Sequence, residues 1–209
     1  MSDALRRKRK LAVVTVKRDL ILTAAKTLFA ENGLDGTSVR DIACLAGYTT
    51  GAIYFHYANK EELYAAILQD SLDRLFVLVS DSVAGSDSPL STLPAAFRAL
   101  VGFYAANPHD LDLSLYLLGG ARPRGLTPAL NKVLNGKLRA VLGIYRQELL
   151  RAGVRESELN VEVAGLFDEM IGALVAANTG RLKVIGTDLK SVVDHHTSNL
   201  ITRLSNLKR

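Results

Sequence analysis

The chain has 209 residues, 48% of them hydrophobic, which is enough apolar material to bury one large core or two smaller ones. A single cysteine, Cys44, excludes a disulfide within the chain and argues against a thiolate zinc site. The four histidines lack metal-motif spacing, and no stretch approaches the roughly 20 apolar residues that span a bilayer. We therefore expect a cytoplasmic protein with no metal, no cofactor and no membrane partner.

The positive charge of the chain is concentrated at one end. The first 60 residues hold ten Lys and Arg against five Asp and Glu, which equals the whole net charge of +5. The remaining residues carry 16 charges of each sign. A local basic excess favours a polyanionic partner, nucleic acid before membrane, and the alternative is a solvated basic tail.

The first predicted helix covers about residues 17–32, where apolar side chains recur at helical spacing, and Gly33 stands at the position of a C-cap glycine. The second covers about residues 39–46. Ser38 precedes it, and Asp41 three residues later completes the pattern of a capping box. Both ends of this second helix are therefore predicted from local chemistry.

The third predicted helix covers about residues 50–57, with Thr49 as its N-cap. Gly47 ends the preceding helix and can take the left-handed conformation that reverses the chain. Two short helices joined by a tight glycine turn, after a supporting helix, form a helix-turn-helix motif over about residues 37–56. Such a motif places its second helix in the major groove of DNA.

The residues of this segment resemble the TetR family of bacterial regulators over about residues 17–68. The matching positions are Thr37-Ser38-Val39-Arg40-Asp41-Ile42-Ala43, Ala46-Gly47, Gly51-Ala52-Ile53-Tyr54-Phe55-His56-Tyr57, Lys60 and Leu63. The sequence departs from the family pattern at Tyr48, Thr49 and Tyr57, where Val, Ser and Phe are usual. The resemblance implies a homodimeric DNA-binding regulator of the bacterial nucleoid, commonly a repressor, that responds to a small molecule.

Twelve residues are expected to contact operator DNA. Hydroxyl groups and helix N-termini bind phosphate, and an arginine at position 40 reaches a guanine edge or a phosphate. Tyr54, His56 and Lys60 resemble family positions that contact the DNA backbone. The alternative is packing in the small core for Tyr54, Phe55 and Tyr57, and an inert surface position for His56. The expected contact residues are Thr37, Ser38, Arg40, Tyr48, Thr49, Thr50, Gly51, Ala52, Tyr54, Phe55, His56 and Lys60.

A basic run, Arg6 to Lys10, precedes the first predicted helix. Two interpretations stay open for it. A flexible basic arm reaches into an adjacent minor groove, and a disordered tail only improves solubility. We expect three parts in the chain: a flexible arm over 1–16, a DNA-binding domain over 17–64 and an effector-binding and dimerisation domain over 65–209.

The rest of the chain is predicted to be helical. No segment keeps a period-2 alternation, so the predicted fold class is all-α, an N-terminal three-helix domain followed by a C-terminal helical domain. Asn59 and Glu62 form the cap of the next helix. The helices are predicted at about 60–83, 91–106, 110–118, 128–152, 159–180 and 187–206.

The C-terminal helices are expected to hold an effector pocket and a dimer interface, as the resemblance implies. Residues that could line the pocket are Phe97, Phe103, Tyr104, Leu113, Tyr116, Leu117, Phe167, Met170 and Asn178, with Arg98, Arg122 and Asp168 to orient a polar group. Residues that could form the dimer interface are Leu138, Leu142, Tyr145, Gly165, Gly172 and Val175. A two-fold dimer would present two reading helices to a pseudo-palindromic operator. The alternative for each pocket residue is an ordinary core or surface position, and the alternative to the dimer is a monomer whose own core needs the helix predicted at 159–180.

Two other function classes were weighed. An enzyme built on a helical bundle is disfavoured, because the sequence has no glycine-rich phosphate loop and no nucleophile elbow, and the adjacent carboxylates Asp168 and Glu169 lack a partner histidine. An architectural DNA-binding protein without an effector would bind without a defined palindrome. The sequence identifies neither the effector nor the sign of regulation.

Overall fold

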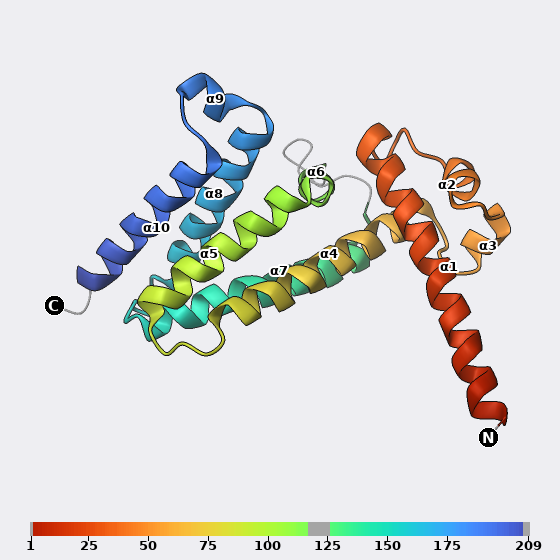
Figure 1. Ribbon diagram of the computed structural model, residues 1–209, viewed down its shortest axis with the longest axis horizontal. Coiled ribbons are helices and arrows are strands. Elements are labelled where there is room, and N and C mark those ends of the chain that lie inside the picture. Colours follow the sequence, from red (N-terminus) through yellow and green to blue (C-terminus); the bar gives the residue numbers. More distant parts are fainter. Residues whose placement is uncertain (1, 117–125, 207–209) are drawn as a thin grey trace. The chain divides into compact units, whose positions relative to one another are not determined.

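The computed structural model describes residues 2–116 and 126–206, and every regular element within them is a helix (Figure 1). The helices are α1 (Ser2–Asn32), α2 (Val39–Ala46), α3 (Thr50–Tyr54), α4 (Lys60–Val83), α5 (Pro89–Ala106), α6 (Pro108–Tyr116), α7 (Pro128–Arg151), α8 (Leu159–Asn178), α9 (Arg181–Ile185) and α10 (Leu189–Asn206). The predicted all-α fold class is confirmed. Among the described residues, no helix is both long enough and apolar enough to cross a bilayer.

The first helix is longer than the sequence analysis predicts. α1 begins at Ser2, whereas the prediction left residues 1–16 as a flexible arm. Residues 4–14 consist only of Ala, Leu, Val, Lys and Arg, and no glycine or proline occurs before Gly33. Most of these residue types are strong helix formers. The structure therefore replaces the flexible arm with helix.

The other helices follow the prediction with shifts at their ends. α2 has the predicted bounds, and α3 ends at Tyr54, before the predicted end at residue 57. The five-residue helix α9 was not predicted. Gly180 and Gly186 lie on either side of it with φ angles of 72° and 84°, so both adopt the left-handed conformation that glycine tolerates.

Contacts between residues divide the chain into two compact units. The first unit combines Met1–Asp70 with His109–Leu134, and the second combines Ser71–Pro108 with Asn135–Arg209. The predicted domain boundary after residue 64 falls in the part of α4 that belongs to the first unit.

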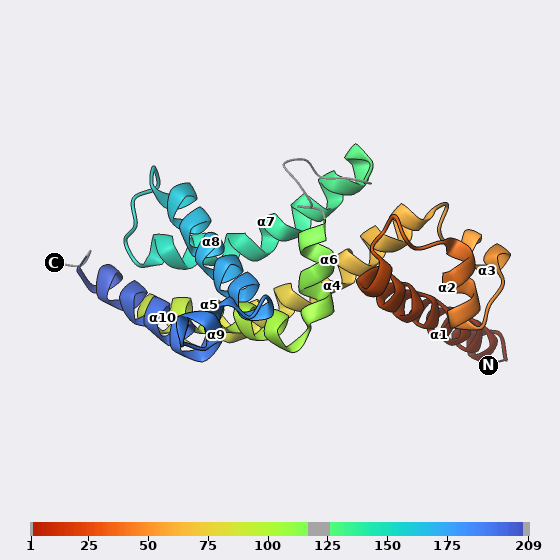
Figure 2. The same ribbon diagram turned by 90° about the horizontal axis from the view of Figure 1, so that it is seen from above.

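The first unit is built around α1, which packs against α2 in both views (Figures 1 and 2). The rings of Phe29 and Tyr64 meet edge to face, with centroids 5.3 Å apart. The core residues of the unit, each at most 2% exposed, include Ile21, Ala25, Phe29, Leu34, Ile42, Ile53, Leu63 and Tyr64. This core holds α2 and α3 in place and leaves their other faces in solvent.

The helix α6 belongs to the first unit through two polar contacts. The Lys26 ammonium of α1 lies 2.5 Å from a carboxylate oxygen of Asp110, a side chain that is fully buried. The hydroxyl of Tyr64 donates a hydrogen bond to the backbone carbonyl of Leu113. An ion pair and a buried hydrogen bond therefore attach α6 to α1 and α4.

The second unit packs α5, α8 and α10 together. Its core residues include Leu93, Phe97, Leu100, Val141, Tyr145, Leu149, Met170, Leu174, Leu200 and Leu204. The phenol of Tyr145 on α7 donates a 2.7 Å hydrogen bond to the carbonyl of Ala96 on α5, which satisfies the buried hydroxyl. Burial raises the pKa of this phenol well above its ordinary value.

A buried carboxylate joins the start of α5 to the end of α7. Glu148 is 6% exposed and accepts a 2.5 Å hydrogen bond from the Thr92 hydroxyl. The Arg151 guanidinium donates to both oxygens of Glu148, at 2.7 and 2.9 Å, and to the backbone carbonyl of Asp87 at 2.8 Å. The charge of Glu148 is therefore paired and hydrogen-bonded, as a buried charge requires.

Candidate nucleic-acid interface

The helix α2 has a defined start and a defined end. The Ser38 side chain accepts a hydrogen bond from the backbone N–H of Asp41, and the Asp41 carboxylate accepts one from the backbone N–H of Ser38, which completes the predicted capping box. Gly47 ends the helix with a φ of 71°, and the N–H of Tyr48 bonds back to the carbonyl of Ala43 at 2.9 Å. These two caps fix where the chain turns toward α3.

The helix α3 starts at the predicted N-cap. The Thr49 hydroxyl accepts a 3.2 Å hydrogen bond from the backbone N–H of Ala52. Ile53 is fully buried and anchors the helix in the core of the first unit, whereas Thr50 and Gly51 are exposed. One face of this short helix therefore packs inward, and the other is presented to solvent.

Two aromatic side chains stand out from the exposed face. Phe55 is 84% exposed and Tyr54 is 55% exposed. The Phe55 ring meets the half-buried ring of His56 edge to face, with centroids 5.0 Å apart. The exposure of Phe55 excludes the packing alternative, because a ring this exposed is not part of the core, and its predicted contact with DNA stays a prediction.

Tyr57 takes the packing role, since only 8% of it is exposed. Its hydroxyl accepts a 3.2 Å hydrogen bond from the Arg18 guanidinium of α1, and this contact raises the pKa of Arg18. The ammonium of the neighbouring Lys17 lies 5.9 Å from the ring centroid of Tyr48. Sequence reasoning missed Lys17 and Arg18, which extend the positive charge of α1 to the turn of the motif.

Lys60 is half-buried at the start of α4. Its ammonium donates to the carbonyl of Leu34 at 2.7 Å and lies 3.4 Å from the carbonyl of Thr37. A lysine ammonium has three donors, so one remains for a phosphate. Lys60 therefore closes the loop between α1 and α2, and its predicted phosphate contact stays a prediction.

Thr37 does not lie where the sequence analysis expected. Its side chain is 3% exposed, and its hydroxyl donates to the carbonyls of Gly33 at 2.8 Å and Leu28 at 3.1 Å. A hydroxyl has a single proton to donate, and here that proton is used to cap the end of α1. The prediction that this hydroxyl binds phosphate is therefore wrong for the structure described.

The remaining predicted contact residues lie at the surface of the first unit. Ser38, Arg40, Thr49, Thr50 and Gly51 are exposed. Tyr48 and Ala52 are half-buried at the turn and on α3. Ser38 and Arg40 thus lie at the start of α2, whereas the predicted residues from Tyr48 to His56 lie in the turn, on α3 and just after it.

The predicted pocket residues fall in both units. In the second unit Phe97, Phe103, Tyr104 and Met170 are buried, Phe167 is half-buried and Asn178 is exposed. Leu113 is buried in the first unit, Tyr116 is the last residue of α6, and Leu117 and Arg122 lie outside the described residues. Arg98 donates to the hydroxyl of Thr197 on α10 at 2.8 Å, and Asp168 is exposed. Their role in binding an effector stays a prediction.

The predicted dimer residues divide into exposed and buried ones. Gly165 and Gly172 are exposed on α8, and Leu138, Leu142 and Val175 are half-buried. Tyr145 is 1% exposed and bonded inside the second unit, so its predicted place in a subunit interface is wrong. Helical spacing places it on an apolar face, but that face meets α5 of the same chain.

Two open grooves mark the surface of the second unit. One lies between α8 and α10, has a volume of about 420 Å³ and includes Gly165 and the 75% exposed Val161. The other lies between α4 and α7, has a volume of about 440 Å³ and includes Phe76 and Gly143. Neither groove is lined by the predicted pocket residues. Within the described parts of the chain, no three His, Cys, Asp or Glu side chains gather as a metal site would require.

The sequence matches known regulators. The family described as "Bacterial regulatory proteins, tetR family" matches residues 21–67. The chain is 33% identical over 160 residues to the HTH-type transcriptional repressor KstR2 of Rhodococcus jostii. The aligned region covers 72% of this chain and 74% of that relative. KstR2 of Mycobacterium tuberculosis is 39% identical over 103 residues. That second match covers 49% of this chain and 50% of the relative, so it spans about half of the relative's length.

The fold is also similar to solved structures. The chain superposes on the structure of AibR in complex with isovaleryl coenzyme A and operator DNA with a TM-score of 0.70 and 20% identity. The superposition covers 87% of this chain and 96% of the AibR chain. At this level of identity the likeness concerns the arrangement of the helices.

Proposed function

Because this chain belongs to the TetR family of bacterial regulatory proteins, we propose that it is a homodimeric transcriptional repressor that binds operator DNA and is released by a small molecule. The observation that carries the proposal is the exposed face of α3, which begins at a capped N-terminus and ends in exposed aromatic rings. As a DNA-binding regulator, it would act in the cytoplasm, on the bacterial nucleoid, and would need no enzymatic activity.

The exposed face of α3 fits the edges of base pairs. Thr50 and Gly51 have little bulk, so the helix backbone can approach the floor of the major groove. Phe55 offers an apolar surface to a thymine methyl, and Tyr54 offers a hydroxyl to a phosphate. Leaving such rings in water is unfavourable, and contact with DNA would bury them.

The charge distribution supports the same partner. The whole net charge of +5 lies in the first 60 residues, the segment that contains α1, α2 and α3. The N-termini of α2 and α3 are exposed at Ser38 and Thr49, and free backbone N–H groups at such ends attract phosphate. Arg40 adds an exposed guanidinium on α2. We infer that phosphates position the motif and α3 reads the bases.

A dimer would form through α8 and α10. The groove between these helices contains Val161 and Gly165, and an added Cβ at Gly165 or Gly172 would meet no described atom within 4 Å. The packing of the described chain therefore gives no reason for these glycines. A second copy of α8 approaching closely would give one, in an isologous two-fold interface. Two reading helices related by that axis would require a pseudo-palindromic operator.

The proposed effector is a coenzyme A thioester. AibR, which shares the fold, was solved with isovaleryl coenzyme A. The second unit supplies apolar side chains for an acyl chain, among them Phe97, Phe103 and Met170. These three side chains are at most 7% exposed in the described state, so an acyl chain could bind among them only if they moved apart. That separation would be the conformational change by which an effector acts.

The experiment that tests the DNA-binding function is a selection of bound duplexes from random DNA, followed by affinity measurements. The double variant Tyr54→Ala/Phe55→Ala should lose at least about 5–150-fold of its affinity for the selected site, because the base contact of Phe55 alone contributes about 1–3 kcal/mol. The matched control is Val184→Ala/Ile185→Ala, which removes two exposed apolar side chains from α9, and it should bind like the wild type. Sequence-blind binding by the wild type would refute the proposal.

A release assay tests the effector. Isovaleryl coenzyme A is added to the protein–operator complex, with free coenzyme A and isovaleric acid as controls. Release by the thioester alone supports the proposed class. If none of the thioesters in a series of increasing acyl length releases the complex, the effector belongs to another class, and the DNA-binding proposal is unaffected.

A further inference from the structure

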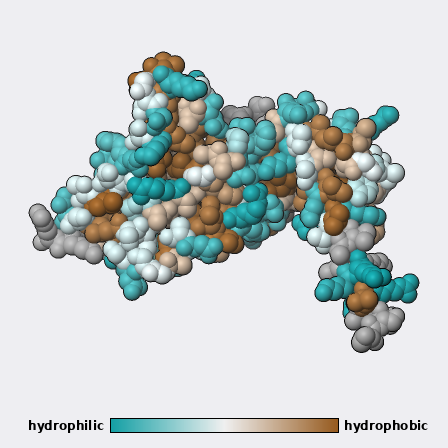
Figure 3. All heavy atoms as spheres, in the orientation of Figure 1, coloured by the Kyte–Doolittle hydropathy of each residue, from teal (hydrophilic) through white to brown (hydrophobic). Residues whose placement is uncertain are grey.

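The N-terminal turns of α1 carry exposed cations beyond the helix-turn-helix motif. Figure 1 shows α1 continuing past α2 and α3 toward the N-terminus, and Figure 3 shows that hydrophilic side chains dominate the surface of this extension. The side chains from Leu5 to Arg9 are exposed, and four of these five residues are Arg or Lys. A charged surface of this kind has no role within the first unit.

One face of α1 looks toward the motif, and two contacts identify it. The Lys17 ammonium lies 5.9 Å from the ring centroid of Tyr48, in the turn between α2 and α3. The Arg18 guanidinium donates a 3.2 Å hydrogen bond to the hydroxyl of Tyr57, just after α3. Lys17 and Arg18 therefore lie on the side of α1 that borders the reading helix.

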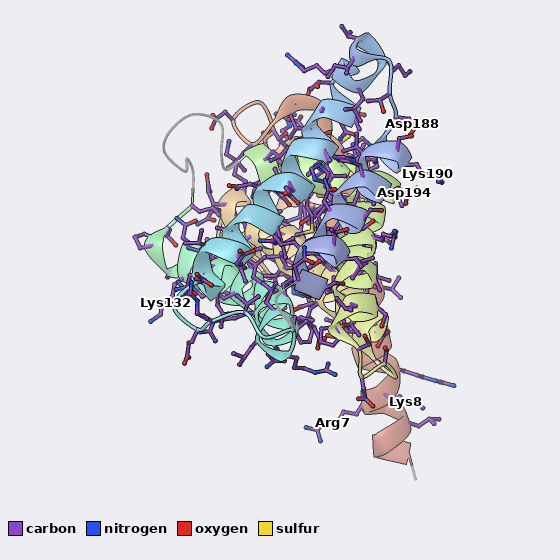
Figure 4. The ribbon with its side chains drawn as sticks, turned by 90° about the vertical axis from the view of Figure 1, so that its left-hand side faces the viewer. Arg7, Lys8, Lys132, Asp188, Lys190 and Asp194 are labelled. Carbon is purple, nitrogen blue, oxygen red and sulfur yellow. The ribbon has the colours of Figure 1, made fainter. Side chains whose placement is uncertain are left out.

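Residues eleven positions earlier in α1 lie on the same face of the helix. Eleven residues make close to three turns of an α-helix and rise roughly 16.5 Å along its axis. Arg6 and Arg7 therefore share the face of Lys17 and Arg18, farther toward the N-terminus. Lys8 and Arg9 point away from this face. Figure 4 shows the side chains of Arg7 and Lys8 leaving the helix on opposite sides.

From this register we propose that Arg6 and Arg7 bind phosphates of duplex DNA beside the half-site that α3 contacts. The inference rests on the proposed DNA-binding function and extends its interface. An α-helix about 10–12 Å wide does not fit a minor groove about 6 Å wide, so a helical extension contacts the phosphate backbone and not the groove floor. Where α1 runs along the duplex, its rise of roughly 16.5 Å between Arg6 and Lys17 corresponds to about five base pairs.

A pair of double variants tests the proposal. Arg6→Gln/Arg7→Gln removes two charges from the face that borders the motif, and Lys8→Gln/Arg9→Gln removes two charges from the other side of the same turns. Glutamine is a good helix former and all four positions are exposed, so both variants should stay folded, which circular dichroism checks. Affinity is measured against salt on the selected operator, once with about ten base pairs of flanking duplex on each side and once trimmed to the half-sites.

The two variants should behave differently. Two lost phosphate contacts per protomer are four per dimer and lower the salt slope by about 3.6, so between 50 and 200 mM salt the wild type should lose about 150-fold more affinity than Arg6→Gln/Arg7→Gln. Lys8→Gln/Arg9→Gln should keep the wild-type slope. Trimming the flanks should lower the wild-type slope to that of Arg6→Gln/Arg7→Gln. Hydroxyl-radical footprints should show protected sugars about five base pairs outside the half-site only when Arg6 and Arg7 are present.

Equal slope changes in both variants would overturn the proposal, because they would show a general charge effect with no preferred face. Unchanged slopes in both would overturn it as well, while specific binding by the wild type would leave the proposed function intact. Failure of the wild type itself to select any sequence would refute the proposed function instead.

Discussion

The ion pair between α1 and α6 gives a sharp prediction, because its two partners differ in burial. The carboxylate of Asp110 is fully buried, whereas 29% of the Lys26 side chain remains exposed. Lys26→Met removes the ammonium from beside a buried carboxylate, and Asp110→Asn leaves an ammonium that can turn toward water. The two single substitutions should therefore destabilise the protein by different amounts.

The magnitudes follow from this asymmetry. Lys26→Met should lower the free energy of unfolding by about 3 kcal/mol, at the lower end of the range for a broken buried pair because water can still approach the lysine side. Asp110→Asn should lower it by about 1 kcal/mol, since a neutral amide is less costly to bury than a charge. For a chain of this size, about 3 kcal/mol corresponds to a fall of roughly 6–12 °C in Tm.

The assay is thermal and urea unfolding followed by circular dichroism for the wild type, both single variants and Lys26→Met/Asp110→Asn. The double variant should recover more than half of the Lys26→Met loss, which gives a coupling energy of at least about 2.5 kcal/mol. If Asp110→Asn is as damaging as Lys26→Met, or if the coupling energy is below about 0.5 kcal/mol, the reasoning from burial is refuted.

Three further predictions concern stability. Gly47→Ala should lower the unfolding free energy by about 1 kcal/mol through backbone strain alone, because φ is 71° there and an added Cβ would meet no described atom. The control Gly102→Ala, at an exposed position within a helix, should raise the unfolding free energy by about 0.5–1 kcal/mol in the same urea titration. Ser38→Ala should lower it by about 1 kcal/mol through loss of the α2 cap, and Ser38→Asp should restore most of that loss. Burial raises the pKa of Tyr145, so its stabilising contribution is complete below pH 10 and decreases above it by up to about 1.4 kcal/mol per pH unit. Tyr145→Phe should remove that part of the alkaline loss, and an unchanged pH profile would contradict the assignment.

The sequence predicted the motif well because local chemistry determines it. The bounds of α2 depend on Ser38, Asp41 and Gly47, and each acts through bonds to residues a few positions away. The start of α1 was harder to predict, because residues 4–14 contain no cap or break that marks a boundary. The strong helix formers in that run are a signal that a propensity sum would have found.

The errors at the candidate site have a different origin. Thr37 and Tyr145 both satisfy their expected local pattern, but long-range packing buries them, and a single sequence gives no direct information on that packing. Lys17 and Arg18 were missed as neighbours of the motif for the same reason. Their eleven-residue relation to Arg6 and Arg7 was present in the sequence, but it carries meaning only once α1 is known to be continuous.

The membership of α6 in the first unit has a practical consequence for dissecting the molecule. The chain leaves that unit after Asp70, returns at His109 and leaves again after Leu134, so a single cut does not separate the two units. A recombinant fragment ending at residue 70 would keep α1 to α3 but lose the carboxylate that Lys26 contacts and the carbonyl to which Tyr64 donates. A minimal DNA-reading fragment should therefore carry residues 109–116 on a designed linker, and a plain truncation should be less stable than the same helices in the whole chain.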